Sequence, residues 1–297
     1  MPFRPWEQYS DVASVAASGI GTMDLPVAGT YYSLALQCLD GGAAVSVANI
    51  KDNITNVKLS LDGVNVLEAD AHFLYDLADQ QYSHNNVFTP QAGILPIFLT
   101  PDHLTNRVQG SALGWGMQGI NSFQAELTFS ANVGAVGHTD QVKVFVERSP
   151  ITRPLGEYRR ITKLARSFAS TGQQEITDLP REGGSRVATT AWHVQFDGSG
   201  GATLDNFEVL LNSQSVIANL PAAVHQHRAA KAGRKWLVSA AAKDLFSVPF
   251  DDSNDLNGYM SHGDVDDLRF RLTWGTAAPG AYSLYRESYH NIGMSNR

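Results

Sequence analysis

Residues 56–67 of the chain read NVKLSLDGVNVL and residues 206–217 read NFEVLLNSQSVI, so the two stretches align without a gap at an offset of 150 residues. In each stretch apolar side chains fall at alternate positions up to a turn pair, Asp62-Gly63 in the first and Asn212-Ser213 in the second. Alternation of this kind predicts strands, and a two-residue turn of this composition joins two strands in a hairpin. The sequence therefore predicts two copies of one hairpin.

The repeat extends to both sides of the hairpin and keeps its order along the chain. Short strands separated by turn signals, with one small helix in each half, are typical of β-sandwiches. The sequence thus predicts an all-β protein made of two β-sandwiches in tandem. The matched segments are short helices over 71–81 and 221–231, and strands over 30–37 and 186–196, 124–129 and 269–274, and 141–147 and 282–286.

The composition excludes several classes of protein. Of the 297 residues, 43% are hydrophobic and 17% are charged, which is the content of a folded rather than a disordered chain. The net charge of −7 argues against nucleic-acid binding as the main task, because phosphate binding needs basic surfaces. Cys38 is the only cysteine, so no disulfide within the chain holds the fold. The sequence has no apolar run long enough to span a membrane, and Glu7 and Asp11 argue against a signal peptide, so we expect neither a membrane-spanning nor a secreted protein.

The segment between the two halves, residues 150–168, reads PITRPLGEYRRITKLARSF. At 100° per residue its apolar side chains gather on one side of a helix and its basic side chains on the other. We therefore predict an amphipathic connecting helix within residues 150–172. Its basic face would bind acidic lipid headgroups, a genome or a partner protein. The alternative is that this face has no binding role and is the ordinary solvated face of a helix. The basic residues are Arg153, Arg159, Arg160, Lys163 and Arg166.

Motifs for catalysis are weak. Residues 114–119, GWGMQG, have the glycine spacing of a dinucleotide-binding loop, but a strand-like segment follows where that motif needs a helix, and we interpret them as a glycine-rich loop. His225 and His227 have a spacing used by bicupins, which are tandem jelly-roll metal enzymes. The glutamate that this motif needs is missing, so we expect surface histidines. Cys38 lies in an apolar strand-like run and is predicted to be a core residue.

An acidic stretch near the C-terminus is a candidate calcium site. Six carboxylates lie within 17 residues, and oxygen ligands at this density repel one another unless a cation or water offsets them. Leu256 occupies the position of the EF-hand glycine, so the stretch is not an EF-hand loop. A solvated turn is the alternative. The candidate ligands are Asp251, Asp252, Asp255, Asp264, Asp266 and Asp267.

Several of these segments, taken in order, resemble the major capsid proteins of corticovirus type. The similarity runs from about Asp24 to about Tyr289. It is carried by the hairpin at 56–63 with its following helix, Tyr158-Arg159-Arg160, residues 175–180 (EITDLP), the strand from Arg186, and residues 267–272 (DLRFRL).

The resemblance implies a double jelly roll, two tandem eight-stranded β-sandwiches with short helices, whose chains form homotrimers. Each trimer would be a pseudo-hexagonal capsomer in an icosahedral shell around an internal membrane. Calcium is implied as a structural ion, and no other cofactor is required. The basic face of the connecting helix would then lie at the inner side of the shell, towards lipid.

From the residues and the resemblance together we predict a structural virion protein without catalytic residues. Its partners would be neighbouring capsomers, penton or minor capsid proteins and the viral inner membrane, with no sequence-specific nucleic acid. It would be located in the virion and assembled in the host cytoplasm. The alternatives are a bicupin-like metal enzyme and a carbohydrate-binding β-sandwich protein.

The predicted domain organisation has five parts. They are an N-terminal arm (1–21) that orders only in the assembled shell, an N-terminal jelly roll (22–149), the connecting helix (150–172), a C-terminal jelly roll (173–290) and a C-terminal tail (291–297).

Overall fold

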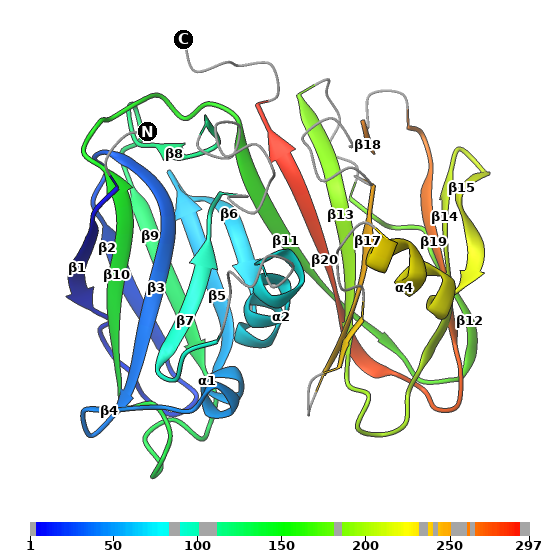
Figure 1. Ribbon diagram of the computed structural model, residues 1–297, viewed down its shortest axis with the longest axis horizontal. Helices are drawn as coiled ribbons and strands as arrows, with labels where there is room; N and C mark the ends of the chain where they lie inside the picture. Colours follow the sequence, from blue (N-terminus) through cyan, green and yellow to red (C-terminus); the bar gives the residue numbers. More distant parts are fainter. Residues whose placement is uncertain are drawn as a thin grey trace. The chain divides into compact units, whose positions relative to one another are not determined.

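The computed structural model describes residues 4–82, 90–100, 112–180, 186–231, 237–239, 243–250, 260–261 and 265–291. The chain forms two compact units, which divide between Thr162 and Lys163. Strands make up most of the described part of each unit, in agreement with the predicted all-β class (Figure 1).

Unit 1 comprises the chain up to Thr162. Its elements are β1 (Trp6–Asp11), β2 (Ile20–Leu25), β3 (Thr30–Asp40), β4 (Ala43–Ala44), α1 (Val47–Asn53), β5 (Ile54–Leu61), β6 (Val64–Ala69), α2 (Ala71–Tyr82), β7 (Ile94–Phe98), β8 (Trp115–Gly116), β9 (Phe123–Phe129) and β10 (Gln141–Ser149). One sheet has the strand order β1-β10-β3-β4, with β7 and β8 also paired to β3, and the other has the order β6-β5-β9-β2. Burial alternates along β5 and β9, so each of these strands has one face in the core and one towards solvent.

Unit 2 begins at Lys163, within a strand that starts in unit 1. The elements are β11 (Tyr158–Phe168), β12 (Gly172–Ile176), β13 (Val187–Phe196), β14 (Leu204–Leu211), β15 (Gln214–Pro221), α4 (Ala222–Lys231), β16 (Leu237–Ser239), β17 (Asp244–Pro249), β18 (Met260–Ser261), β19 (Leu268–Trp274) and β20 (Gly280–His290). One sheet contains β16-β17-β13-β20, with β18 also paired to β13, and the other has the order β12-β19-β14-β15.

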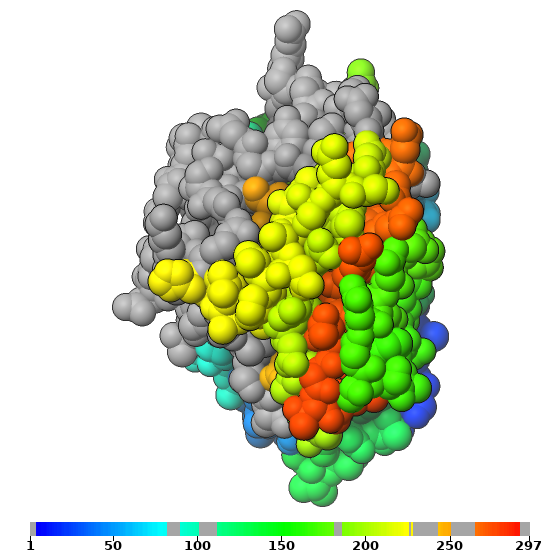
Figure 2. Space-filling model, turned by 90° about the vertical axis from the view of Figure 1, so that its right-hand side faces the viewer, coloured from blue at the N-terminus to red at the C-terminus, as the bar shows by residue number. Residues whose placement is uncertain are grey.

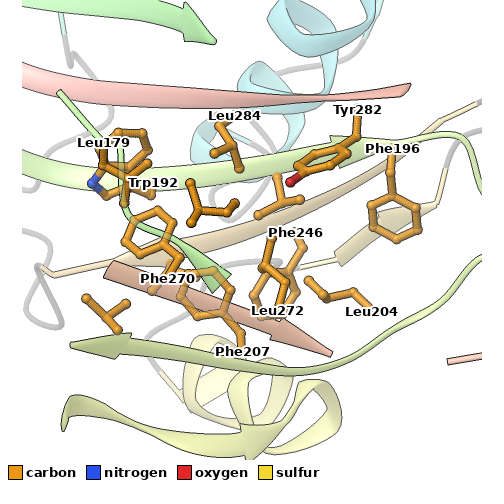
Figure 3. Close-up of a cluster of buried hydrophobic side chains, with 14 of the residues drawn as sticks. Leu179, Trp192, Phe196, Leu204, Phe207, Phe246, Phe270, Leu272, Tyr282 and Leu284 are labelled. Atoms are coloured by element: carbon orange, nitrogen blue, oxygen red, sulfur yellow. The ribbon is translucent and has the colours of Figure 1, made fainter. Parts of the chain in front are cut away.

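The core of unit 2 is rich in aromatic side chains from both of its sheets. Trp192 on β13 packs edge-on against Phe270 on β19, with ring centroids 5.0 Å apart. Phe196 and Trp274 repeat this contact further along the same strands, at 5.2 Å. Figure 3 shows these strands contributing side chains to one buried cluster. Burial of this cluster is the main stabilisation of the unit, because apolar surface removed from water drives folding.

The two predicted hairpins are confirmed. They are β5–β6 and β14–β15, and in each one both turn residues have a positive φ: +46° and +76° at Asp62 and Gly63, +49° and +65° at Asn212 and Ser213. Positive φ at both central positions is the conformation that matches the twist of a two-residue hairpin. The helices predicted after the hairpins are also present, as α2 and α4.

The predicted connecting helix is wrong, because residues 158–168 form strand β11. Ile161 in this strand pairs with Leu67 of β6. Burial does not alternate along β11, because the neighbouring residues Tyr158 and Arg159 are both buried and residues 162–164 are all half-buried. The sequence therefore lacks the alternation by which strands are recognised, and its apolar spacing suggested a helix instead.

The predicted N-terminal arm is also part of the fold. Residues 6–11 form β1, an edge strand that pairs with β10, for example Glu7 with Val146. Arg148 reinforces this pairing, because its Nη2 donates to Glu7 Oε2 at 2.9 Å. The segment predicted to order only in the shell is thus paired within the chain itself.

The glycine-rich segment 114–119 contains a strand. Trp115 and Gly116 form β8 and pair with Tyr31 and Thr30 of β3. A Cβ at Gly116 would lie 2.2 Å from the carbonyl oxygen of Arg153. Glycine is needed here for a close backbone approach, which explains the motif without a nucleotide.

Candidate functional site

The first residue of each hairpin turn holds a distant loop. In unit 1, Asp62 Oδ1 accepts hydrogen bonds from the backbone N–H groups of Asn121 at 2.8 Å and Ser122 at 2.9 Å. The backbone N–H of Asp62 donates in return to the carbonyl oxygen of Ser122, at 2.9 Å. We call this arrangement the turn clamp, and it fixes the residues that lead into β9.

Unit 2 repeats the turn clamp at equivalent positions. Asn212 Oδ1 accepts from the backbone N–H groups of Asp266 at 2.9 Å and Asp267 at 3.0 Å, and the Asn212 N–H donates to the Asp267 carbonyl oxygen at 2.8 Å. The residues held here lead into β19, the counterpart of β9. The duplication therefore extends to individual side-chain hydrogen bonds.

The turn clamp also shows what two of the candidate calcium ligands do. Asp266 and Asp267 are held through their backbone, and the Asp267 carboxylate pairs with Arg269, with Nε and Oδ2 2.7 Å apart. The other four candidates, Asp251, Asp252, Asp255 and Asp264, lie outside the described residues. Within the described part of the chain there is no cluster of three or more metal-ligating side chains.

The five basic residues predicted to form one face do not share a face. Neighbouring side chains of a strand point to opposite sides, so Arg159 and Lys163 lie on one face of β11, and Arg160 and Arg166 on the other. Arg159 is buried, and its Nη1 donates to the carbonyl oxygen of Phe98 at 3.3 Å. The single basic surface expected from a helix therefore does not form.

Two of these basic side chains bind partners within their own unit. Arg153 Nη2 donates to the hydroxyl of Tyr32 at 3.0 Å in unit 1, and Arg166 Nη2 lies 3.0 Å from Asp178 Oδ2 in unit 2. The membrane- or genome-facing role of the five residues stays a prediction, now for residues on different faces. Among the described residues, no helix is long and apolar enough to cross a membrane.

His225 is a core residue, and the expectation of a surface histidine is wrong for this position. Its ring is fully buried, lies edge-on to Phe207 and Phe246, and places Nε2 3.4 Å from the Phe207 carbonyl oxygen. The equivalent residue of unit 1, Tyr75, is also buried, and its hydroxyl donates to the carbonyl oxygen of Ile94. His227 is exposed. The pair His225 and His227 is therefore split between core and solvent and does not form a metal site.

Unit 1 buries several titratable groups. Lys51 Nζ on α1 lies 2.7 Å from Asp76 Oδ1 on α2. Burial raises the pKa of Asp76 to about 6, although Lys51 opposes the shift. Burial also raises the pKa of Cys38 to about 12 and so keeps this thiol protonated, as a core residue rather than a nucleophile.

One face of the sheet β12-β19-β14-β15 carries a chain of ion pairs, in which Arg269, Arg271 and Glu175 are partly exposed and Glu208 is buried. Arg271 is its centre, because its Nε lies 3.1 Å from Glu175 Oε2 and its Nη1 lies 3.3 Å from Glu208 Oε2. Arg269 Nη1 adds a contact of 3.1 Å to Glu175 Oε1. Hydrogen bonds from Arg271 and Arg269 lower the pKa of Glu175. Figure 2 shows β19 on the surface between β12 and β14, where this face is open to solvent.

The corresponding face of unit 1 lies on the sheet β6-β5-β9-β2. Lys58 on β5 is directly opposite Glu126 on β9 and Glu68 on β6. Two amide groups hold Glu68, since Asn65 Nδ2 donates to it at 2.7 Å and Asn56 Nδ2 at 3.4 Å. Both units thus present a polar sheet face with one cation between two carboxylates.

The described residues contain no cluster of metal-ligating side chains, and their exposed features include polar sheet faces and the edge strand β1. Residues 7–145 match the family model "Viral coat protein P2 N-terminal domain". Nearly half of the chain is thus similar in sequence to a domain of a viral coat protein.

Solved structures show the same fold along the whole chain. The major capsid protein P2 of bacteriophage PM2 has a TM-score of 0.76 at 17% sequence identity, with 97% of each chain covered. A Sulfolobus turreted icosahedral virus structure has a TM-score of 0.67 at 12% identity, covering 98% of this chain and 91% of that one. The PBCV-1 virus capsid has a TM-score of 0.64 at 12% identity, covering 99% and 96%. No curated protein matches the chain in sequence.

These comparisons confirm the predicted corticovirus-type resemblance, the double jelly roll and the function of a major capsid protein of an icosahedral virion. Coat proteins are structural, so the alternative of a metal enzyme is not supported. As a capsid component the chain assembles with neighbouring subunits. Sequence reasoning found the repeat but missed the turn clamp and the two charged faces, although Asp62, Asn212 and the charged strand residues were all visible in the aligned copies.

Proposed function

We propose that three copies of the chain form one pseudo-hexagonal capsomer in the shell of an icosahedral virus with an internal membrane. The observation that carries this proposal is the equivalence of the two units, which share a hairpin, its turn conformation and the turn clamp of Asp62 and Asn212. Three chains with two similar units each supply six similar edges around a threefold axis. Such a particle can occupy a position of sixfold shape in a shell.

Assembly supplies stability that a single chain lacks. Interfaces of permanent assemblies commonly bury about 2,000 Å² or more, and binding to the folded state stabilises it by mass action. The solvent faces of the two units and the edge strand β1, every residue of which is exposed, are the surfaces available for such contacts. The exposed aromatic residues Trp6 and Tyr9 on β1 are of the types that anchor protein interfaces.

Native mass spectrometry of the purified protein tests the trimer directly. The expected species has three times the 32.2 kDa mass of the chain, and class averages from electron microscopy should show a six-sided outline. A protein that stays monomeric at micromolar concentration contradicts the proposal. A trimer whose averages show three separate lobes contradicts the pseudo-hexagonal part alone.

The proposal extends to contacts with neighbouring capsomers, penton or minor capsid proteins and an inner membrane, and to assembly in the host cytoplasm. The similarity to the major capsid protein P2 of bacteriophage PM2 supports the contacts with neighbouring capsomers. Purified particles should contain phospholipid in a constant ratio to this protein. Particles of full infectivity without lipid contradict the membrane contact.

A further inference from the structure

The chain contains two copies of most elements, and the copies differ in how far they are covered. Strands β1 to β10 form the first repeat and β11 to β20 the second, with β11 as the counterpart of β1. Residues 4–9 read RPWEQY and residues 153–158 read RPLGEY, so an arginine, a proline and a tyrosine recur at an offset of 149 residues. By their order and pairing, β20 corresponds to β10, β15 to β6 and α4 to α2.

At the first and last strands of the repeats, the first copy is open and the second is covered. Every residue of β1 is exposed, and Tyr9 is 44% exposed where its counterpart Tyr158 on β11 is 9% exposed. Burial alternates along most of β10, whereas residues 284–290 of β20 are all buried. The surface formed by β1 and β10 is therefore open in the first repeat only.

At the second hairpin strand and the helix that follows it, the first copy is covered and the second is open. Val66 on β6 is 1% exposed, but its counterpart Val216 on β15 is 51% exposed. Residues 71–78 of α2 are all buried, so this part of the helix is covered on every side, whereas α4 exposes Val224 and His227. The surface formed by β15 and α4 is therefore open in the second repeat only.

A strand pairing joins two of the covered elements. Leu67 on β6 is the parallel partner of Ile161 on β11, and both residues belong to unit 1. Their counterparts, β15 and β1, are each the last strand of a sheet among the described residues. The outer edge of such a strand offers backbone N–H and C=O groups to another chain. The chain thus has two open edge strands whose counterparts pair with each other.

The two open surfaces also fit each other in chemistry. Trp6 and Tyr9 are exposed on β1, and the exposed large hydrophobic residues in the described part of unit 2 are Val216 and Val224. Figure 2 shows β15 and α4, in yellow, at the surface. The sequence of β1, WEQYSD, has two acidic and no basic residues, whereas that of α4, AAVHQHRAAK, has an arginine, a lysine and no acidic residue. Large apolar anchors with complementary charges beside them are typical of protein interfaces.

We infer that the surface of β15 and α4 on one copy binds the surface of β1 and β10 on the next copy, and that β15 and β1 run parallel in this contact. The contact between copies repeats the pairing of β6 with β11 inside each copy. A contact between two different surfaces is head-to-tail, and such contacts form a ring when the rotation closes. The six repeats of three copies then follow one another by the same step, as a pseudo-hexagonal capsomer requires. This inference rests on the proposed trimer and names the surfaces that hold it together.

Three matched variants test the two surfaces separately. One carries two lysines on β1, one carries two lysines on β15 and α4, and a control carries two lysines at exposed positions outside both surfaces. They are W6K/Y9K, V216K/V224K and I20K/V136K. Native mass spectrometry and dilution measure the affinity of the trimer. The wild type and the control form trimers of equal affinity, and each of the other variants weakens the trimer about tenfold or more, because a charge replaces each apolar anchor.

Paired cysteines test the parallel arrangement of the two strands. The residues that precede Leu67 and Ile161 are opposite each other in a parallel pair. Their counterparts in the open strands are Val216 and Asp11, which are both exposed. In the trimer their Cα atoms lie about 5 Å apart, within reach of a disulfide. Mild oxidation of D11C/V216C therefore links chains into covalent dimers and trimers, whereas D11C and V216C alone stay unlinked, and the buried Cys38 adds no background.

Two results overturn the inference while leaving the proposed trimer intact. One is a lysine variant on either surface with the trimer affinity of the control; failure of that variant to form shells would then assign its surface to a different capsomer or a minor capsid protein. The other is a D11C/V216C trimer that stays unlinked on oxidation. A monomeric wild type contradicts the proposed trimer itself.

A lysine variant that melts below the control is replaced by a milder one, W6A/Y9A or V216S/V224S. The replacement must still weaken the trimer several-fold, and unchanged affinity contradicts the inference.

Discussion

Replacing Asp62 by alanine should destabilise unit 1 measurably, although the residue is exposed and lies in a turn. The substitution removes the oxygen that accepts hydrogen bonds from the backbone of Asn121 and Ser122, at 2.8 and 2.9 Å. It also leaves alanine at a φ of +46°, a conformation that aspartate and asparagine tolerate better than other L-residues.

The magnitude follows from these two effects. Each hydrogen bond contributes about 1 kcal/mol, so the pair contributes about 2 kcal/mol, and the backbone conformation costs alanine about 1 kcal/mol. A loss of about 3 kcal/mol lowers the melting temperature of a unit of this size by about 6 to 12 °C. Asp62→Asn keeps an acceptor oxygen and the tolerated φ, so its melting temperature should stay within about 3 °C of the wild type.

Differential scanning calorimetry of the purified protein measures this series. The equivalent change in unit 2, Asn212→Ala, should show a loss of similar size, because Asn212 accepts the same two bonds. Asn212→Asp should also destabilise at neutral pH, since it adds a carboxylate beside Asp266 and Asp267. Equal melting temperatures for Asp62→Ala and Asp62→Asn would refute the turn clamp.

Three further predictions concern packing, pH and metal. Gly116→Ala should lower the melting temperature by several degrees, because the new Cβ would lie 2.2 Å from the carbonyl oxygen of Arg153. The control Gly200→Ala should leave the melting temperature unchanged, because a Cβ there meets no atom within 4 Å. Equal melting temperatures for the two variants would contradict the close approach at Gly116. Burial raises the pKa of Asp76 from 3.8 to about 6, so its contribution to stability is fully present below pH 3.8 and is lost as the pH rises to about 6. Calorimetry between pH 4 and 7 should show a smaller pH dependence for Asp76→Asn, and identical slopes would contradict this assignment. Chelation of calcium should lower the melting temperature of the wild type. It should not lower that of a variant with asparagine in place of Asp251, Asp252 and Asp255. An equal response of the two proteins would exclude the calcium site.

Patterns within a few residues of sequence correctly predicted the hairpins, whose structure depends on neighbouring residues. The hairpin at Asp62-Gly63 has both alternating strands and a turn pair suited to positive φ, and each signal comes from residues close in sequence. The second hairpin has the less typical pair Asn212-Ser213, and the repeat made it recognisable. The fold class followed from these signals, because a duplicated pattern carries more information than either copy.

Local patterns failed where the neighbours of a segment decide its structure. Burial along strand β11 does not alternate, because Tyr158 and Arg159 are both buried and most later residues are half-buried, so its sequence lacks the alternation of a strand with one solvated face. His225 is buried because aromatic residues far along the chain, Phe207 and Phe246, surround it. The turn clamp joins Asp62 to residues about 60 positions away, a contact that no short window contains.

Burial of Cys38 has a consequence for the life of a particle outside its host. Extracellular fluid lacks the reductases that repair oxidised thiols inside cells, and the reactive form of cysteine is the thiolate. Cys38 lies in the interior of β3 with a pKa of about 12, and the sequence contains no second cysteine. The shell is therefore built from subunits in which the thiol of Cys38 is shielded from air and peroxide, so this thiol cannot readily cross-link two subunits during storage.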